Sequence, residues 1–318
     1  MTGAGTAACV LGGAAALVLG GAYACYRLAF GVDRRRSCLA RDLPRGEQYE
    51  PLYGRMLSLI DDAERRRGED VWMENREGLR LHARYYEAAP GAPLQILFHG
   101  YRSSAIRDFC GGLGRELDRG WNVLLVDQRA HGRSGGRCLS FGVMERLDCL
   151  AWVEWARGRF GARTPTVLVG ISMGAATVLM AAGLELPENV RGILADCGYT
   201  APSDIIRSVM ASMHCPRAIY PLLRLGGRLY GGFDIDSAGA EEALRRCRVP
   251  VLFVHGEDDR FVPCDMSRRN WAACASEKTL LTVPGAGHGL SYLVDEPGYE
   301  AALEEFFERL HLPARVNA

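Results

Sequence analysis

The 318-residue sequence has no net charge at neutral pH, because 38 acidic side chains match 38 basic ones. A balanced chain has no overall field that attracts nucleic acid, so we expect no nucleic-acid partner. The 11 cysteines never occur as Cys-x-x-Cys, and their spacing fits no metal or redox motif. We therefore expect no metal and no organic cofactor, and thiols that stay free in a reducing compartment.

Charged residues are also missing from Ala4 to Tyr26. A helix of about 23 residues at ~1.5 Å per residue spans ~34 Å, which is enough to cross a bilayer. Small residues recur at every fourth position of this run, a pattern typical of packed membrane helices: Ala8, Gly12, Ala16, Gly20 and Ala24. We expect residues 1–30 to form a single transmembrane anchor, and the smooth face of this helix favours a homodimer.

Basic residues follow this run, at Arg27 and at positions 34–36. The positive-inside rule then predicts a single-pass protein of the cell membrane with its main domain in the cytoplasm. A cleaved signal peptide and a secreted protein are the alternative, because Ala22-Tyr23-Ala24 is similar to a cleavage site, although a basic n-region is missing. Residues 31–69 are polar and rich in Arg and Glu, which predicts a linker with one covering helix.

Two consecutive strands are expected from residue 70, and from Leu94 onward apolar strands alternate with helical patterns, which is typical of an α/β fold with a mostly parallel sheet flanked by helices. The expected strands are Asp70–Asn75, Leu79–Glu87, Leu94–Phe98, Val123–Val126, Val167–Gly170, Gly192–Ala195, Val251–Val254 and Leu280–Val283. The expected helices are Ile106–Asp118, Val143–Arg157, Ala175–Leu184, Glu241–Arg246, Met266–Ala275 and Tyr299–Leu310. Residues 70–318 are predicted to form one domain.

The sequence Gly170-Ile171-Ser172-Met173-Gly174 lies between an expected strand and an expected helix. This is the context of a nucleophile elbow, in which a sharp turn exposes the serine hydroxyl above the sheet. Glycines on both sides avoid collisions with the neighbouring strand and helix. The helix that begins after Ser172 offers free N–H groups to a developing oxyanion.

A serine hydroxyl needs a base within hydrogen-bonding distance, and the base needs an acid that orients it. Two later loops supply these groups, each directly after an expected strand: His255-Gly256-Glu257-Asp258-Asp259 and Pro284-Gly285-Ala286-Gly287-His288. The order serine, acid, histidine is that of hydrolases built on parallel sheets.

Together these motifs resemble the α/β-hydrolase family, and within it the membrane-anchored serine-aminopeptidase-like and BEM46-like serine hydrolases, over residues 71–310. The resemblance implies an α/β-hydrolase fold with a small cap insertion at about residues 199–238. It implies a triad of Ser172, His288 and Asp259. It also implies an oxyanion hole formed by the backbone N–H groups of Met173 and Tyr101.

Asp258 and Asp196 are the alternatives for the acid, the first as the neighbour of Asp259 and the second because some relatives recruit the acid from that strand. We expect structural roles for His99, His131 and His255. Serine at the elbow excludes epoxide opening and dehalogenation, which need a carboxylate there, and indicates acyl transfer.

The predicted cap holds many apolar residues, which suit a lipophilic group in the substrate or simply pack onto the main domain. We therefore expect a carboxylesterase acting on an apolar acyl ester, with a small-molecule ester or acyl compound as its substrate. A peptidase or an acyl-thioester hydrolase is the alternative, because the same machinery serves amides and thioesters. A membrane-anchored binding module without catalysis is a third hypothesis, and it predicts the loss of a triad residue.

Overall fold

The computed structural model describes residues 3–33 and 39–313, and within them it leaves out the side chains of residues 3–12 and 14. The centre of the molecule is an eight-stranded sheet with the order β1-β2-β4-β3-β5-β6-β7-β8. The first two pairings are antiparallel and the other five are parallel. The strands are β1 (Glu69–Glu74), β2 (Arg80–Tyr86), β3 (Leu94–Phe98), β4 (Asn122–Val126), β5 (Thr166–Ile171), β6 (Val190–Asp196), β7 (Val251–Gly256) and β8 (Lys278–Val283).

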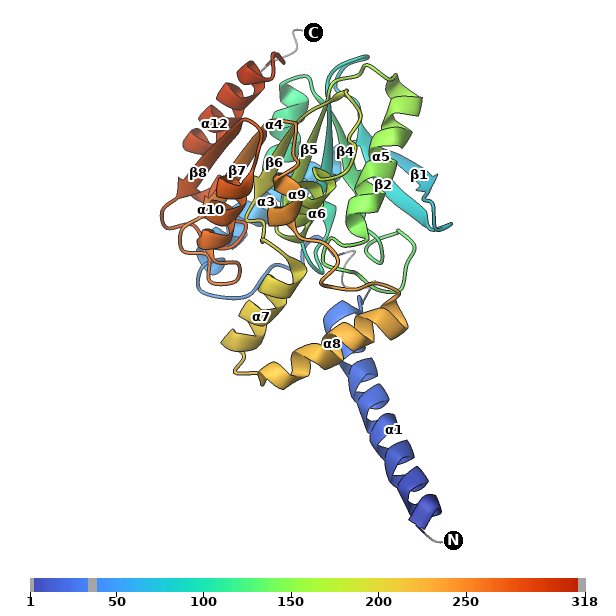
Figure 1. Ribbon diagram of the computed structural model, residues 1–318. Helices are drawn as coiled ribbons and strands as arrows, with labels where there is room; N and C mark the ends of the chain where they lie inside the picture. Colours follow the sequence, from blue (N-terminus) through green and yellow to red (C-terminus); the bar gives the residue numbers. More distant parts are fainter. Residues whose placement is uncertain (1–2, 34–38, 314–318) are drawn as a thin grey trace.

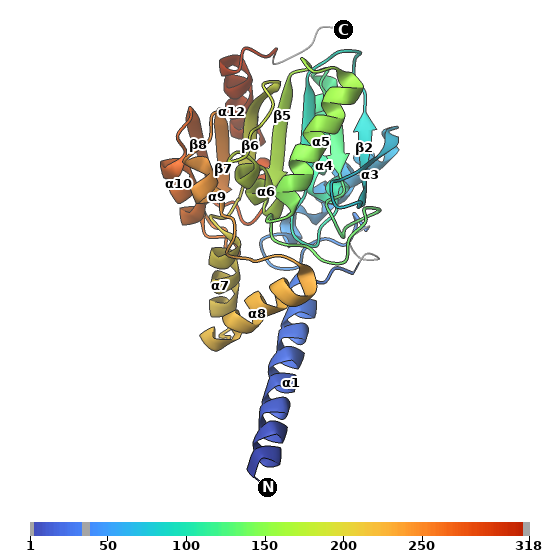
Figure 2. The ribbon, with the colours of Figure 1, turned by 45° about the vertical axis from the view of Figure 1, so that its right-hand side comes forward.

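Helices cover both faces of this sheet (Figures 1 and 2). The parallel strands are apolar along almost their whole length because each face is buried. One face packs against α5 (Glu145–Phe160), α6 (Met173–Ala181), α9 (Ala240–Leu244) and α10 (Cys264–Ala273). The other packs against α3 (Tyr53–Arg65), α4 (Ala105–Asp118) and α12 (Glu296–Arg309), with the short α11 (Ser291–Val294) before α12.

The predicted α/β fold with a mostly parallel sheet is confirmed, and all eight expected strands are present. Alternation of apolar strands and amphipathic helices is a local signal, which explains why the sequence carries it. The polar segment after residue 38 contains a short 3-10 turn, η1 (Glu50–Leu52), and the expected covering helix, α3. Its apolar stripe is buried at Met56, Ile60 and Ala63.

The insertion between β6 and β7 contains α7 (Pro202–Ser212), η2 (Arg217–Ile219), α8 (Tyr220–Gly226) and η3 (Gly227–Gly231). In Figure 1 it lies at the end of the molecule from which α1 projects. Ile206, Met210 and Leu223 of this insertion belong to the main apolar core. These three side chains therefore pack onto the rest of the protein, whereas Met213 and Leu229 of the same insertion are exposed.

Helix α1 (Gly3–Phe30) projects from the body at its N-terminal end and joins it at its C-terminal end (Figure 2). Among the described residues, no helix is both long and apolar enough to cross a membrane. This finding does not support the transmembrane anchor that we predicted over residues 1–30, and residues 1–2 of that segment lie outside the described part of the chain.

The C-terminal half of α1 is part of the packed domain. Ala22, Tyr26 and Phe30 are buried, and α1 crosses α8 closely. A Cβ at Gly226 of α8 would lie 2.4 Å from the carbonyl oxygen of Ala22, so glycine is required at this crossing. No sequence pattern predicts this packing, because apolar helical residues suit a lipid environment and a protein core equally.

Candidate active site

Ser172 stands at the turn between β5 and α6 with φ of 57° and ψ of −115°. A positive φ is strained for a residue with a side chain, and it persists only where the surroundings impose it. A Cβ at Gly170 would lie 2.2 Å from the carbonyl oxygen of Gly174, and a Cβ at Gly174 would lie 1.7 Å from that of Phe98. The two glycines are therefore required by close backbone approach, as the elbow motif predicts.

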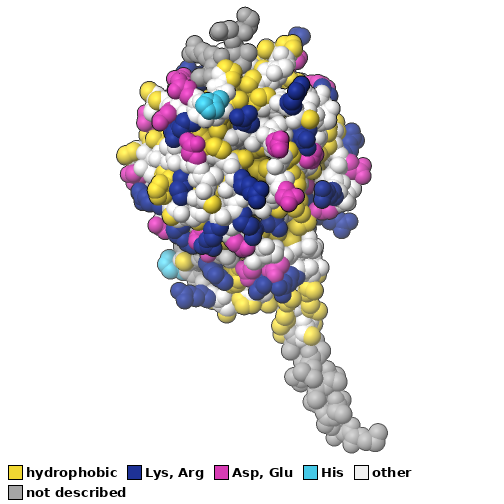
Figure 3. All heavy atoms as spheres, turned by 45° about the horizontal axis from the view of Figure 1, so that its top comes forward, with side chains coloured by type: hydrophobic (Ala, Val, Ile, Leu, Met, Phe, Trp, Pro, Cys, Tyr) yellow, Lys and Arg dark blue, Asp and Glu magenta, His cyan; other side chains and the backbone are white. Residues whose placement is uncertain are grey.

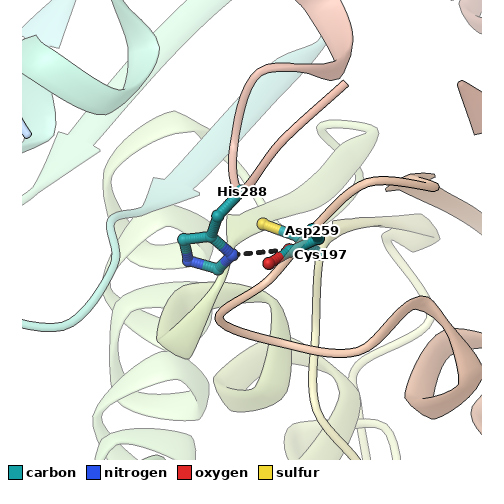
Figure 4. A group of neighbouring side chains, drawn as sticks. All are labelled: Cys197, Asp259 and His288. Atoms are coloured by element: carbon teal, nitrogen blue, oxygen red, sulfur yellow. Dashed lines mark hydrogen bonds and ion pairs between the residues drawn. The ribbon is translucent and has the colours of Figure 1, made fainter. Parts of the chain in front are cut away.

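His288 and Asp259 meet Ser172 from two other loops, after β8 and after β7. The Nε2 atom of His288 lies 2.9 Å from the Oγ atom of Ser172, and its Nδ1 atom lies 2.7 Å from the Oδ2 atom of Asp259. The structure thus joins the three residues predicted from the motifs in one chain of hydrogen bonds. Figure 4 shows the bond between His288 and Asp259.

The Asp259 carboxylate is fully enclosed and well supplied with donors. Its Oδ1 atom accepts hydrogen bonds from the backbone N–H groups of Phe261 and Val262, each at 2.8 Å. Burial alone would raise the pKa of Asp259, but His255 and His288 stabilise the charged form and hold this pKa well below its ordinary value. The carboxylate is therefore ionised at neutral pH and able to orient His288.

The alternative acids do not reach His288 in this way. Asp196 is buried and lies 3.4 Å from the hydroxyl of Ser291, and burial raises its pKa to about 6. The exposed residue Asp258 uses its backbone carbonyl to accept a hydrogen bond from Gln48. Among these three carboxylates, the structure places Asp259 against the imidazole.

The predicted oxyanion donors lie on two segments beside the serine. Helix α6 begins at Met173, whose N–H group has no acceptor within the helix. The loop after β3 passes directly over the serine, because a Cβ at Gly100 would lie 3.3 Å from the Cβ of Ser172. The Tyr101 ring stacks on Phe141 and its hydroxyl donates to the carbonyl oxygen of Ala29, so only the Tyr101 backbone is free to serve this site.

Two buried histidines brace this loop. His99 accepts a hydrogen bond from the backbone N–H of Gln128, and His131 accepts one from the backbone N–H of Arg102. Burial lowers the pKa of both imidazoles, so both are neutral. His255 is held between Ser267 and Val262 and lies 3.2 Å from Asp259.

A polar segment within the predicted linker closes one side of the site. The Tyr49 hydroxyl donates to the backbone carbonyl of His288 at 2.9 Å, and Gln48 donates to that of Asp258 at 2.9 Å. The two residues thus hold the loops that carry the imidazole and the carboxylate. No motif marks them, because their contacts span more than 200 positions of the chain.

A cavity of about 550 Å³ opens at Ser172 and His288. Tyr49 and Met56 border it on one side, and it continues between the sheet and helices α4 and α12. None of the residues that line it comes from the insertion at 199–238. Of the two roles expected for its apolar residues, the described structure shows packing onto the core, to which Ile206, Met210 and Leu223 belong.

Three possible metal donors lie together at the same place. One ligand atom each from Cys197, Asp259 and His288 falls within 4.8 Å of the others (Figure 4). Asp259 and His288 already bind each other, and burial raises the pKa of the Cys197 thiol well above its ordinary value. A metal would need that thiol deprotonated and His288 without its Nδ1 proton, so the residues present do not favour a resident ion.

Known proteins resemble this chain in sequence and in fold. The family model described as the alpha/beta hydrolase family matches residues 95–303. The YqkD protein of Bacillus subtilis is 29% identical over 199 residues, which cover 61% of this chain and 65% of YqkD. The human protein ABHD12B is 26% identical over 65% of this chain and 59% of its own length. The chain therefore spans less than two thirds of each of these two relatives.

Another relative is the bem46 protein of Schizosaccharomyces pombe, 24% identical over 69% of both chains. Among solved structures, the esterase Pf2001 of Pyrococcus furiosus superposes with a TM-score of 0.62 at 21% identity, over 78% of this chain and 94% of that one. The esterase Est1E of Butyrivibrio proteoclasticus, solved with ferulic acid, gives a TM-score of 0.60 at 20% identity, over 76% and 99%. At these sequence identities, the superpositions show a shared fold and nothing further.

Proposed function

The chain belongs to the alpha/beta hydrolase family, and from that premise we propose that it is a serine hydrolase that cleaves carboxylic esters. The observation that carries the proposal is the chain of hydrogen bonds from Ser172 through His288 to Asp259, at 2.9 and 2.7 Å. A buried serine at a strained turn, an imidazole in contact with its hydroxyl and an ionised acid that orients the imidazole are the parts that acyl transfer requires. The esterase names of the two structural neighbours agree with this choice.

In the proposed reaction the Oγ atom of Ser172 attacks the ester carbonyl carbon while Nε2 of His288 takes the hydroxyl proton. Asp259 accepts the hydrogen bond from Nδ1 of His288 and stabilises the imidazolium. The N–H groups of Met173 and Tyr101 bind the tetrahedral oxyanion. Collapse of this intermediate expels the alcohol, which receives the proton from His288 and leaves an acyl group on Ser172.

Water then completes the cycle. His288 removes a proton from the water, the resulting attack forms a second tetrahedral intermediate, and the carboxylic acid leaves as Ser172 regains its proton. Thioesters and amides pass through the same acyl-enzyme, so they are the second candidate substrates. A membrane-anchored binding module remains the opposing hypothesis, and it predicts no turnover.

The test is turnover of 4-nitrophenyl butyrate by the full chain. We expect loss of turnover in Ser172→Ala. In the wild type, a burst of nitrophenol precedes the steady state when hydrolysis of the acyl-enzyme is slower than its formation. Ser212→Ala is the matched control, because Ser212 is exposed and its hydroxyl, among the described residues, donates to the carbonyl oxygen of Val209 in its own helix. Unchanged turnover in Ser172→Ala would contradict the proposal.

We also propose that α1 attaches the protein to a membrane surface. Leu17 and Leu28 are 79% and 75% exposed, and apolar side chains gather on the described part of this helix where it leaves the body (Figure 3). Exposed apolar area of this kind partitions into lipid interfaces. Leu17→Glu is expected to reduce flotation with phospholipid vesicles, while the control Leu147→Glu on α5 leaves it unchanged.

A further inference from the structure

The cavity at Ser172 runs away from the insertion and down one face of the sheet. Its walls include Leu97 of β3, Val169 of β5 and Leu194 of β6. These three side chains point to the same face, the one covered by α4 and α12. Phe109 of α4 and Leu303 of α12 line the opposite wall. The cavity therefore occupies a gap in the helical layer, with apolar walls on both sides.

The strand register gives the depth of this gap. Gln95, which lines the far end, pairs with Val167, five residues before Ser172. At ~3.3 Å per residue this separation is ~16 Å along the strand. An extended chain advances about 1.2 Å per bond, since the three bonds of a backbone residue span at most ~3.6 Å. The cavity therefore has the length of about 13 bonds. The bond to Ser172 takes one of them and a terminal hydrogen bond of ~2.8 Å takes the length of about two, which leaves about ten bonds, or eleven atoms, for the bound chain.

The far end of the cavity is polar. Gln95 donates a hydrogen bond of 2.6 Å to Glu116, and both side chains are buried. Glu300 also lines this end, and its Oε2 atom accepts from Arg119 while its Oε1 atom has no hydrogen-bond partner among the described residues. Buried carboxylate oxygens without a partner are costly, and a ligand that donates a hydrogen bond would satisfy one.

The charges at this end are unequal. Three carboxyl groups, those of Glu116, Glu300 and Glu304, surround one buried guanidinium, that of Arg119, whose Nε atom lies 3.7 Å from Glu116. Burial raises the pKa of Glu116 to about 7, and Arg119 itself is not among the residues that line the cavity. A carboxylate at the end of a bound chain would meet carboxyl groups and be disfavoured. A hydroxyl or an ammonium group would meet acceptors.

We propose that this cavity binds the acyl group of the substrate as an extended linear chain of about ten to twelve atoms that ends in a hydrogen-bond donor. The ester carbonyl lies at Ser172, the methylenes lie between the sheet and helices α4 and α12, and the terminal hydroxyl or ammonium reaches Glu116 and Glu300. This proposal rests on the proposed serine hydrolase function and adds the substrate class to it.

Gly112 of α4 offers a direct way to shorten the gap. It lines the cavity, and a Cβ built on it meets no atom within 4 Å among the described residues. A leucine there would project into the cavity. Gly158 of α5 is the matched control, because it is also a helical glycine with open space at its Cβ, and it lies outside the cavity. Both substitutions raise helix propensity to the same extent.

The experiment compares kcat/KM for 4-nitrophenyl butyrate and decanoate in the wild type, Gly112→Leu and Gly158→Leu. Butyrate needs only the mouth of the cavity and reports correctly folded enzyme, so the decanoate-to-butyrate ratio is the readout. We expect this ratio to exceed one in the wild type, to fall at least tenfold in Gly112→Leu and to stay unchanged in Gly158→Leu. A wild-type series should then rank the 10-hydroxydecanoate ester above the decanoate ester, and both above the half-ester of decanedioic acid.

The outcomes separate the two proposals. Hydrolysis of butyrate with the same ratio in wild type and Gly112→Leu would overturn the chain-binding proposal and leave the hydrolase intact. Preference for the decanedioic half-ester would contradict the proposal that the far end of the cavity binds a hydrogen-bond donor. Failure to hydrolyse any of these esters, together with no covalent labelling of Ser172, would overturn the proposed function and the chain-binding proposal with it.

Discussion

Phe30, at the end of α1, tests whether the N-terminal helix is part of the folded domain or only an attachment. The side chain is fully buried, and its ring packs edge-on against Phe141 at 5.9 Å and Phe233 at 5.0 Å between centroids. Removal of a buried phenylalanine side chain costs about 3–5 kcal/mol, from lost transfer free energy and the cavity left behind. We therefore expect Phe30→Ala to lower the free energy of unfolding by about 3–5 kcal/mol.

The assay is urea unfolding followed by tryptophan fluorescence, with the midpoint and the slope fitted separately. Leu28→Ala is the matched control, because Leu28 lies on the same helical turn and is 75% exposed. Its substitution should change the free energy by less than about 0.5 kcal/mol. Equal and small effects of both substitutions would refute the packing of α1 against the domain.

Three further changes test the site. Asp259→Asn should lower kcat about 10⁴-fold, the loss known for this change in a serine-protease triad, and pH-rate profiles check it. The pKa of Asp259 is lower in the folded protein than in the unfolded chain. The ionised carboxylate therefore stabilises the fold fully above about pH 4, and this contribution is lost as the pH falls toward the folded pKa. Asp259→Asn should thus lower the free energy of unfolding more at pH 7 than at pH 3. Equal destabilisation at both pH values would contradict this. Gly174→Ala should prevent folding of the elbow, since the added Cβ would lie 1.7 Å from the carbonyl oxygen of Phe98. Gly158→Ala, the control, should raise the free energy of unfolding by about 1 kcal/mol. Thermal unfolding midpoints measure both effects. Tyr49→Phe should lower kcat severalfold with little change in KM, since it frees the His288 loop without touching the substrate carbonyl; an unchanged kcat would show that Tyr49 does not position this loop.

The C-terminal end of α1 also contacts the loop that follows β3 at the site. The Tyr101 hydroxyl bonds to Ala29 at 3.0 Å, and the Arg102 guanidinium bonds to the Gly31 carbonyl at 2.8 Å. The loop that carries one predicted oxyanion donor is thus held by the last turn of the N-terminal helix. A shortened protein that begins after residue 36 would lose these contacts, so activity measurements belong on the full chain.

Features with a local signal were predictable from the sequence. The central strands β3, β4, β5 and β7 are short, mostly apolar runs between turns, and the elbow at Ser172 requires glycines at fixed positions whatever the rest of the fold. His288 and Asp259 could be found because each follows a strand in a recognisable loop. Such signals depend on a few neighbouring residues.

Features that depend on distant contacts were not predictable. Gln48 and Tyr49 lie in a polar stretch without a motif, and their partners lie more than 200 residues away. The apolar residues of the insertion at 199–238 could line a site or pack on the core, and composition does not separate the two. Tyr26 and Phe30 fell within the predicted transmembrane anchor because burial in protein and burial in lipid favour the same side chains.

The central claim is that Ser172 is the nucleophile activated by His288. Its most direct test is reaction of the full chain with a fluorophosphonate, followed by peptide mapping, in the wild type and in His288→Ala. We expect phosphonylation at Ser172 alone in the wild type and loss of that modification in His288→Ala. Modification at another residue, or equal labelling of Ser172 in both proteins, would contradict it.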